Sequence, residues 1–196
     1  MRRSIALVAV SSVAALIVVA AAVAAGSKMK ADPVKYDPDK TGIIVAAWQA
    51  HTGLADAGGS DHELVLQKNG PTPTNAAAFA VITGAEGQTV SGDPWGWDYK
   101  SSSYCGAGAP RFNVQASDGF HFLGGCTNST QSPTPGAPGW TRVRIDPFNP
   151  TQAFPPIAAG ATIQSVSIAF DEQGQGLIDN VVVNGGPKIQ KPGNND

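Results

Sequence analysis

Short alternating segments bounded by glycine and proline constrain this chain most. After residue 40, no window keeps apolar residues at helical spacing without a glycine or proline inside it. In Arg111–Ala116, Phe112 and Val114 share one face and polar side chains share the other, which is the two-residue period of a half-buried strand. With 23 glycines and 15 prolines among 196 residues, the sequence predicts an all-β protein of short strands joined by turns.

About eight strands are expected, the number typical of an antiparallel β-sandwich or jelly roll. Asp118-Gly119 lies between two alternating segments and predicts a hairpin. Ala76–Val81 is rich in alanine, so a helical turn is the alternative there. The expected strands are Gly42–Trp48, Glu63–Lys68, Ala78–Thr83, Arg111–Ala116, Gly119–Leu123, Trp140–Ile145, Ile163–Phe170 and Leu177–Asn184.

The N-terminus predicts export. Arg2 and Arg3 precede an apolar run from Ile5 to Ala25 that ends in small residues, so residues 1–25 are expected to form an apolar export helix, either a cleaved signal peptide or an N-terminal membrane anchor. Contact with a membrane is expected only through residues 5–25 of an uncleaved chain. Both alternatives place the remaining residues in a secreted or extracytoplasmic location.

The rest of the chain divides into three predicted parts. Residues 26–40 are polar, contain two prolines and predict a linker. Residues 41–186 are expected to form one β-sandwich domain, and residues 187–196 a disordered tail. Without residues 1–25 the chain has 11 basic and 15 acidic side chains. This mildly acidic balance argues against a nucleic-acid partner.

Cys105 and Cys126 are 21 positions apart and flank the predicted hairpin. In an oxidising compartment they are expected to form a disulfide. A redox or metal role is the alternative, but the sequence has neither a CxxC motif nor clustered histidines beside them.

Trp95, Trp97 and Tyr99 alternate along the sequence, so an extended backbone would project all three rings to one face. Exposed aromatic rings in a row are typical of a ligand-binding platform, for example one that stacks on sugar rings. The alternative is that these rings pack in the core, because four tryptophans supply much of the buried area of a glycine-rich domain.

Asp171, Glu172 and Asp179 bracket a glycine-containing turn between the last two expected strands. If the three carboxylates converge at a sheet end, they would bind a structural calcium ion. The alternative is that they are solvated turn residues. No other cofactor is expected.

Evidence for catalysis is sparse. Gly58-Gly-Ser60-Asp-His62 places a serine, an aspartate and a histidine side by side, whereas a catalytic triad converges from separate elements. His51, His62 and His121 lack the spacing of metal ligands. The sequence therefore favours a protein that is not an enzyme, although a hydrolase with an unfamiliar site stays open.

The end of the chain carries a resemblance to a known type of module. Ser167–Asp171 and Gly176–Gly185, about a tenth of the sequence, resemble the closing strands of secreted jelly-roll modules of the carbohydrate-binding type. The resemblance implies a jelly-roll fold and a tendency to bind glycans. Tyr104–Val114, Gly124–Cys126 and Gly139–Arg144 resemble segments of exported bacterial proteins, from which no activity follows.

The expected function is therefore that of an exported, noncatalytic β-sandwich that binds carbohydrate or another cell-surface ligand. The alternative is a structural or interaction domain at the cell surface with no small-molecule site.

Overall fold

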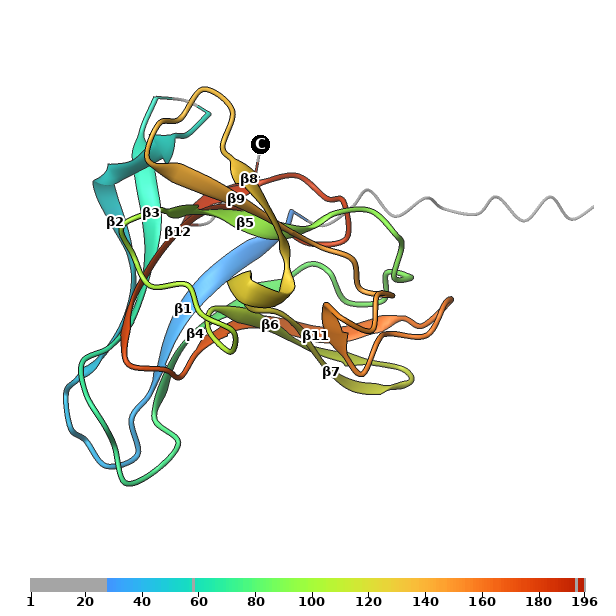
Figure 1. Cartoon of the computed structure of the whole chain (residues 1–196), viewed down its shortest axis with the longest axis horizontal. Helices are drawn as coiled ribbons and strands as arrows, with labels where there is room; N and C mark the ends of the chain where they lie inside the picture. Colours follow the sequence, from blue (N-terminus) through green and yellow to red (C-terminus); the bar gives the residue numbers. More distant parts are fainter. Residues whose placement is uncertain (1–27, 58, 193, 196) are drawn as a thin grey trace, which may run out of the picture.

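The computed structural model describes residues 28–57, 59–192 and 194–195. Within these residues the strands form two antiparallel sheets that pack against each other as a β-sandwich, and helical structure is limited to the 3-10 turn η1, Cys126–Asn128. In Figure 1, β5 and β9 lie above β6, β11 and β7. These residues contain no helix that is long and apolar enough to span a membrane. The predicted export segment, residues 1–25, lies outside the described residues.

The first sheet has the strand order β1-β4-β11-β6-β7-β10. In that order its strands are Lys30–Tyr36, Ala77–Thr83, Ile163–Phe170, Arg111–Ala116, Gly119–Gly124 and Ala153–Phe154.

The second sheet has β12 at its centre. β3 and β13 pair with successive parts of β12, β5 pairs with its other side, and the sheet continues from β5 through β9 to β8. β2 extends the sheet beyond β3, and β14 extends it beyond β13. The strands are β2 (Ile44–Ala55), β3 (Asp61–Lys68), β5 (Trp95–Lys100), β8 (Thr130–Pro133), β9 (Trp140–Ile145), β12 (Gly174–Val182), β13 (Ile189–Lys191) and β14 (Asn194–Asn195).

Four nested antiparallel pairs organise the sandwich. The innermost pair is β6 with β7, and the successive outer pairs are β5 with β9, β4 with β11 and β3 with β12. The chain crosses between the sheets along each arm of this nested arrangement. The fold is therefore a long two-stranded ribbon wrapped around one core.

The eight strands expected from alternation are all present, three of them with the predicted bounds. The hairpin predicted at Asp118-Gly119 is confirmed, since Ala116 pairs with Gly119 across a two-residue turn. Residues 77–83 form a strand and not a helical turn, because both neighbours of this segment, β1 and β11, hydrogen-bond to it.

Two boundary predictions are wrong. The expected linker, residues 26–40, contains β1, and the expected disordered tail, residues 187–196, contains β13 and β14. β1 is an edge strand with exposed lysines and Pro33, a composition that edge strands tolerate and that also suits a tether. Ala31 in β1 and Ile189 in β13 are nevertheless buried, so both segments belong to the packed domain.

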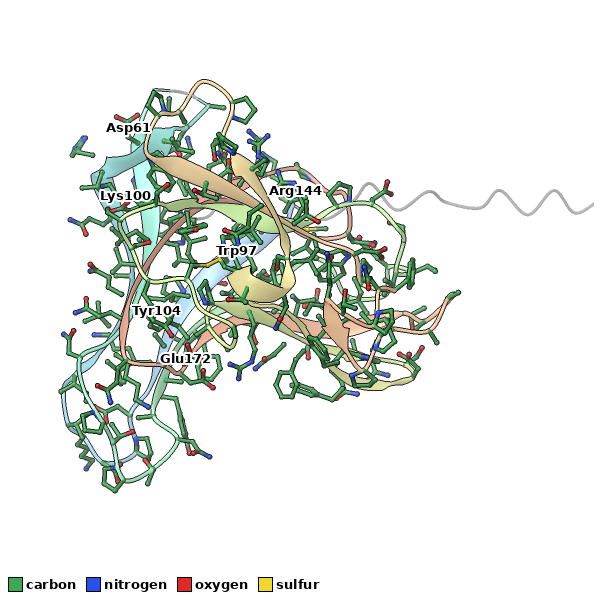
Figure 2. The ribbon with its side chains drawn as sticks, viewed as in Figure 1. Asp61, Trp97, Lys100, Tyr104, Arg144 and Glu172 are labelled. Atoms are coloured by element: carbon green, nitrogen blue, oxygen red, sulfur yellow. A yellow bond between two sulfur atoms is a disulfide. The ribbon has the colours of Figure 1, made fainter. Side chains whose placement is uncertain are left out.

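The core is built around three aromatic rings from the two sheets. Trp95 and Trp97 of β5 meet Phe112 of β6 edge to face, with ring centroids 5.5 Å and 5.2 Å apart. Both indoles are fully buried, and Figure 2 shows Trp97 between the two sheets. Tyr99 is partly buried against the same core. The predicted alternation is correct, but the exposed platform is wrong, because the shared face of these rings is the inner one.

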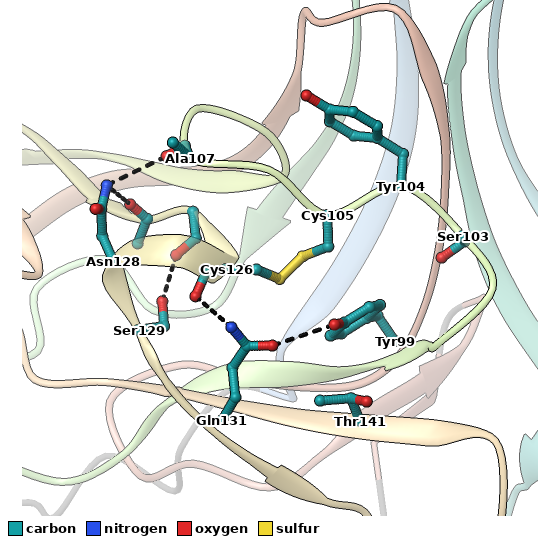
Figure 3. Close-up of a disulfide and its surroundings, with 12 residues drawn as sticks. Tyr99, Ser103, Tyr104, Cys105, Ala107, Cys126, Asn128, Ser129, Gln131 and Thr141 are labelled. Carbon is teal, nitrogen blue, oxygen red and sulfur yellow. Dashed lines mark hydrogen bonds between the residues drawn. A yellow bond between two sulfur atoms is a disulfide. The ribbon is translucent and has the colours of Figure 1, made fainter.

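The disulfide between Cys105 and Cys126 is present, as predicted. It ties the loop after β5 to η1, with Cα atoms 5.5 Å apart. Gln131 braces this region, since its amide donates to the Cys126 carbonyl at 2.7 Å and accepts from the Tyr99 hydroxyl at 3.1 Å (Figure 3). The disulfide thus joins segments that flank the innermost hairpin.

Trp97→Ala is expected to lower the free energy of unfolding by about 3–5 kcal/mol, because it removes a buried ring and leaves a cavity. Trp97→Phe is the matched control: it keeps an aromatic ring and removes an indole N–H that has no hydrogen-bond partner among the described residues, so its loss should be clearly smaller. Urea unfolding measures both. Equal, small losses for the two variants would place Trp97 outside the core.

The Cys105→Ser/Cys126→Ser variant is expected to lose about 3 kcal/mol of stability, because opening a loop of this length frees the unfolded chain. Reduction of the wild type should produce a similar loss. Thermal unfolding with and without reductant measures it, and unchanged melting of the reduced wild type would contradict the prediction.

Candidate functional site

Large apolar side chains gather on the outer face of the first sheet. Among the described residues, six of the seven exposed large hydrophobic side chains lie there, on strands β1, β4, β7 and β10: Val34, Tyr36, Val81, Phe120, Phe122 and Phe154. The solvent face of an antiparallel sheet is usually polar. Large apolar side chains exposed on such a face are typical of an interaction site. We call this surface the aromatic face.

Register brings the rings of the aromatic face together. Phe154 pairs directly with Phe122 across β10 and β7, and both side chains are about two-fifths exposed. Phe120 meets Phe122 edge to face, with ring centroids 5.0 Å apart. These three rings form a cluster at one end of the aromatic face.

Arg111 lies on β6, an inner strand of the same sheet. Its guanidinium pairs with both carboxylate oxygens of Asp171 at 2.8 Å, donates to the Gly108 carbonyl at 2.7 Å and to the Asn113 amide oxygen at 3.1 Å. The guanidinium carbon also lies 5.0 Å from the centroid of the Phe122 ring, within range of a cation–π contact. These contacts fix the guanidinium and the ring before any ligand arrives.

Two depressions meet at Arg111. A groove of about 260 Å³ is lined by Arg111, Phe122, Phe154 and Asn128. A larger cleft of about 580 Å³ is lined by Lys68, Phe79, Arg111, Asp171 and Glu172. Arg111 lines both, so the two depressions adjoin at this residue and together make one candidate site. Its walls combine aromatic rings with charged and amide side chains, the composition of a polar-ligand site.

Arg111 and Asp171 form an ion pair in the cleft. Burial alone would raise the pKa of Asp171, but the hydrogen bonds and charge of Arg111, with the charge of Lys68, outweigh it and hold this pKa below its ordinary value. A general acid needs a raised pKa, so Asp171 is unsuited to that role. Glu172 accepts a hydrogen bond from Tyr104, and this bond is the largest cause that raises the Tyr104 pKa, followed by burial and the Glu172 charge. Figure 2 shows the two side chains together.

The calcium site expected from Asp171, Glu172 and Asp179 is wrong as a cluster. Asp171 is bonded to Arg111, Glu172 to Tyr104, and Asp179 to backbone N–H groups of Leu54 and Asn180. Five residues of β12 separate Asp179 from the turn that begins this strand. The described residues contain no group of three or more acidic, histidine or cysteine side chains arranged to hold a metal ion.

A second polar region lies on the outer face of the second sheet, yet it is buried. Asp98 receives two hydrogen bonds from Arg142, at 2.8 and 3.0 Å, and one from the Asn180 amide at 2.9 Å. The Gln190 amide donates to the Asn180 side-chain oxygen at 2.8 Å, so Gln190 of β13 belongs to the same hydrogen-bond network. The hydrogen bond from Arg142 to Asp98 is the largest cause that raises the Arg142 pKa. We call this network the polar layer.

A bulge in β2 completes the cover of the polar layer. Ala50 and Leu54 both pair with His62, so three residues between them leave the ladder. The bulge directs the Leu54 N–H to Asp179 at 2.7 Å. A Cβ on Gly53 would lie 1.9 Å from the His62 carbonyl oxygen, so glycine is required at this close approach. Burial raises the pKa of Asp179 to about 7, opposed by its two backbone hydrogen bonds and supported by the nearby Asp56 and Asp98 charges.

Ser60 and His62 do come together, but through Asp56 and not Asp61. The Ser60 hydroxyl donates to Asp56 Oδ2 at 3.1 Å, and His62 Nδ1 lies 2.7 Å from the same oxygen. A triad needs the serine hydroxyl on the histidine, whereas here both groups bind the carboxylate. The arrangement closes a loop and does not form a nucleophile.

Sequence reasoning placed the aromatic surface on the wrong strand. Gly119–Leu123 was expected to be a strand, and Phe120 and Phe122 both occupy its alternate positions opposite His121 and Leu123. Leu123 and the two phenylalanines lie on opposite faces of this strand, and a single core can bury only one of these faces. The apolar residues on the remaining face are the sequence signal of the aromatic face. Comparison of this chain with protein-family models, curated proteins and solved structures gave no match.

Wild-type stability is expected to fall as pH rises through about 7 because of Asp179. Its folded pKa is raised, so the folded state holds the proton more tightly and the stabilisation present below about pH 4 is lost as the pH passes about 7. Asp179→Asn should flatten this part of the pH profile, whereas Asp61→Asn at an exposed position should not. Chemical unfolding from about pH 4 to about pH 8 compares the three proteins. Parallel profiles for wild type and Asp179→Asn would contradict the prediction.

Proposed function

We propose that this protein is an exported, noncatalytic domain that binds carbohydrate along the aromatic face. The observation that carries the proposal is the pair of depressions that share Arg111, which are lined by aromatic rings together with fixed polar groups. Aromatic rings stack on the apolar faces of sugar rings, and charged or amide groups bind the hydroxyl groups. Since Arg111 and Phe122 already hold each other, little side-chain entropy is lost on binding.

The strand order supports a jelly-roll assignment for the sandwich. Numbered along the chain, the eight strands of the nested ribbon pair first with eighth, second with seventh, third with sixth and fourth with fifth, which is the arrangement of a jelly roll. The disulfide supports an oxidising, extracytoplasmic location. Both features agree with the resemblance of the closing strands to carbohydrate-binding modules.

The cleft favours an uncharged glycan. Two cationic side chains, Lys68 and Arg111, face two anionic ones, Asp171 and Glu172, within the same cleft. Lys68 donates to the Asp171 carbonyl at 3.0 Å, and Arg111 pairs with the Asp171 carboxylate. A ligand with hydroxyl groups finds donors and acceptors here without having to displace a charge.

The aromatic face also fits the alternative of a surface-interaction domain. Val34, Tyr36 and Val81 are further exposed apolar side chains on β1 and β4, outside the lining of the two depressions, and exposed apolar areas are typical of protein contacts. A binding assay distinguishes the two functions, since only the first requires the rings that line the groove.

Phe122→Ala and Phe154→Ala are each expected to reduce glycan affinity at least tenfold while changing stability little, because these rings are exposed. Tyr36→Ala is the matched control, since Tyr36 is exposed on the same face but lines neither depression. A glycan array with wild-type residues 26–196 finds the ligand, and calorimetry compares the variants. Glycan binding that survives both phenylalanine changes would overturn the proposed site. Wild type that binds no glycan but associates with a cell-surface protein would favour the interaction domain.

A further inference from the structure

Arg144 lies on the outer face of the second sheet, away from the aromatic face. In β9 it pairs with Gly96 of β5 on one side and with Thr130 of β8 on the other. A Cβ on Gly96 would lie 2.0 Å from the Val143 carbonyl oxygen and 3.1 Å from Arg144 Nη1. Glycine between the two core tryptophans therefore leaves the space that the guanidinium occupies. Figure 2 shows Arg144 beside these strands.

Arg144 has no ion-pair partner among the described residues. Arg111 and Arg142 each pair with an aspartate at 2.8 Å. Arg144 forms no ion pair with any described residue, and its guanidinium donates to the Val143 carbonyl at 2.7 Å. Burial is the largest cause that lowers the pKa of Arg144, the Arg142 charge lowers it further, and Asp98 opposes both. A partly buried guanidinium without a direct ion-pair partner is costly to the fold.

Arg144 lines a pocket of about 360 Å³ whose other polar groups include Thr130, Asp146, Asn149 and Gln152. The fold already uses the amide oxygens of the last two. Asn149 Oδ1 accepts from the backbone and hydroxyl of Thr151, and Gln152 Oε1 accepts from the Asp146 N–H at 2.7 Å. These bonds orient both amide groups, and the Gln152 amide also donates to the Thr130 hydroxyl at 3.4 Å. Together with Arg144, they make the pocket rich in donors.

Asp146 adds a single acceptor to this pocket. Its Oδ1 accepts from the Phe148 N–H at 2.9 Å, which fixes the carboxylate at the turn after β9. The second oxygen can accept from a hydroxyl group of a ligand whose anionic group sits on Arg144. A simple anion would use only half of this arrangement.

We propose that the Arg144 pocket is a second binding site, for an anionic saccharide unit whose carboxylate or sulfate group pairs with Arg144 and whose hydroxyl group binds Asp146. A guanidinium matches the two oxygens of a carboxylate or sulfate in a fork geometry. The site is independent of the aromatic face, which lies on the other sheet.

Thermal unfolding with added ligand tests the site, because a ligand that binds the folded state raises the melting temperature. The probes are glucuronate, glucose 6-sulfate and glucose, at constant ionic strength set with sodium chloride. We expect at least one anionic sugar to raise the wild-type melting temperature and glucose to leave it unchanged. The response to glucuronate against glucose 6-sulfate identifies the anionic group. Phe122→Ala should respond as the wild type does, which separates this site from the aromatic face.

Arg144→Gln should lower the affinity for the anionic sugar at least tenfold, since it removes the charge-assisted pair. Without ligand this variant should melt at the same temperature as the wild type or higher, because an unpaired, partly buried charge is removed. Lys35→Gln, an equal charge change at an exposed position, should keep the response. An equal rise in wild type and Arg144→Gln, or no rise with either anionic sugar, would overturn the proposal. A lower melting temperature of ligand-free Arg144→Gln would make Arg144 a structural residue and would equally overturn it.

Discussion

The contact of Phe112 with Trp95 and Trp97 is the constraint on which the rest of this structure depends. It joins the two sheets at the centre of the core, and it fixes which face of β5 and which face of β6 point inward. Because side chains alternate along a strand, the same contact sends Gly96 and Asp98 to one outer face, and Arg111 and Asn113 to the other. Both proposed binding surfaces are thus set by one aromatic cluster.

The outer faces of the two sheets differ in which side chains they carry and in how deeply these are buried. The first sheet leaves large apolar side chains in water, which no requirement of the core explains. The second sheet buries Asp98 and Asp179, and buried carboxylates need partners. Arg142, Asn180 and the bulge in β2 supply them, and β13 covers the network through Gln190. The contacts of the polar layer are therefore explained by the need to satisfy buried carboxylates. The exposed rings of the aromatic face have no such structural explanation, and for this reason we assign binding to the aromatic face.

Arginine serves three purposes in this domain, and its partners distinguish them. Arg142 neutralises a buried aspartate, Arg111 is braced by Asp171 and in turn positions an exposed ring, and Arg144 has no anionic partner among the described residues. Arg142 and Arg144 are two positions apart on the same face of β9, so the difference does not come from the strand. It comes from the residue opposite, an aspartate in one case and a glycine in the other.

The sequence by itself determined the local features: the eight alternating strands, the hairpin at Asp118-Gly119 and the pairing of the two cysteines. These depend on side-chain period, turn chemistry and cysteine number, which are all local or nearly so. Alternation assigned Trp95, Trp97 and Tyr99 to one face, but which face is buried depends on the partner sheet, and only the tertiary structure decided that. The same holds for β1 and β13, whose polar composition suits a free segment until a neighbouring strand pairs with them. The surface around Arg111 and the pocket around Arg144 join residues from strands far apart in the chain, so long-range register, which no local pattern encodes, placed them.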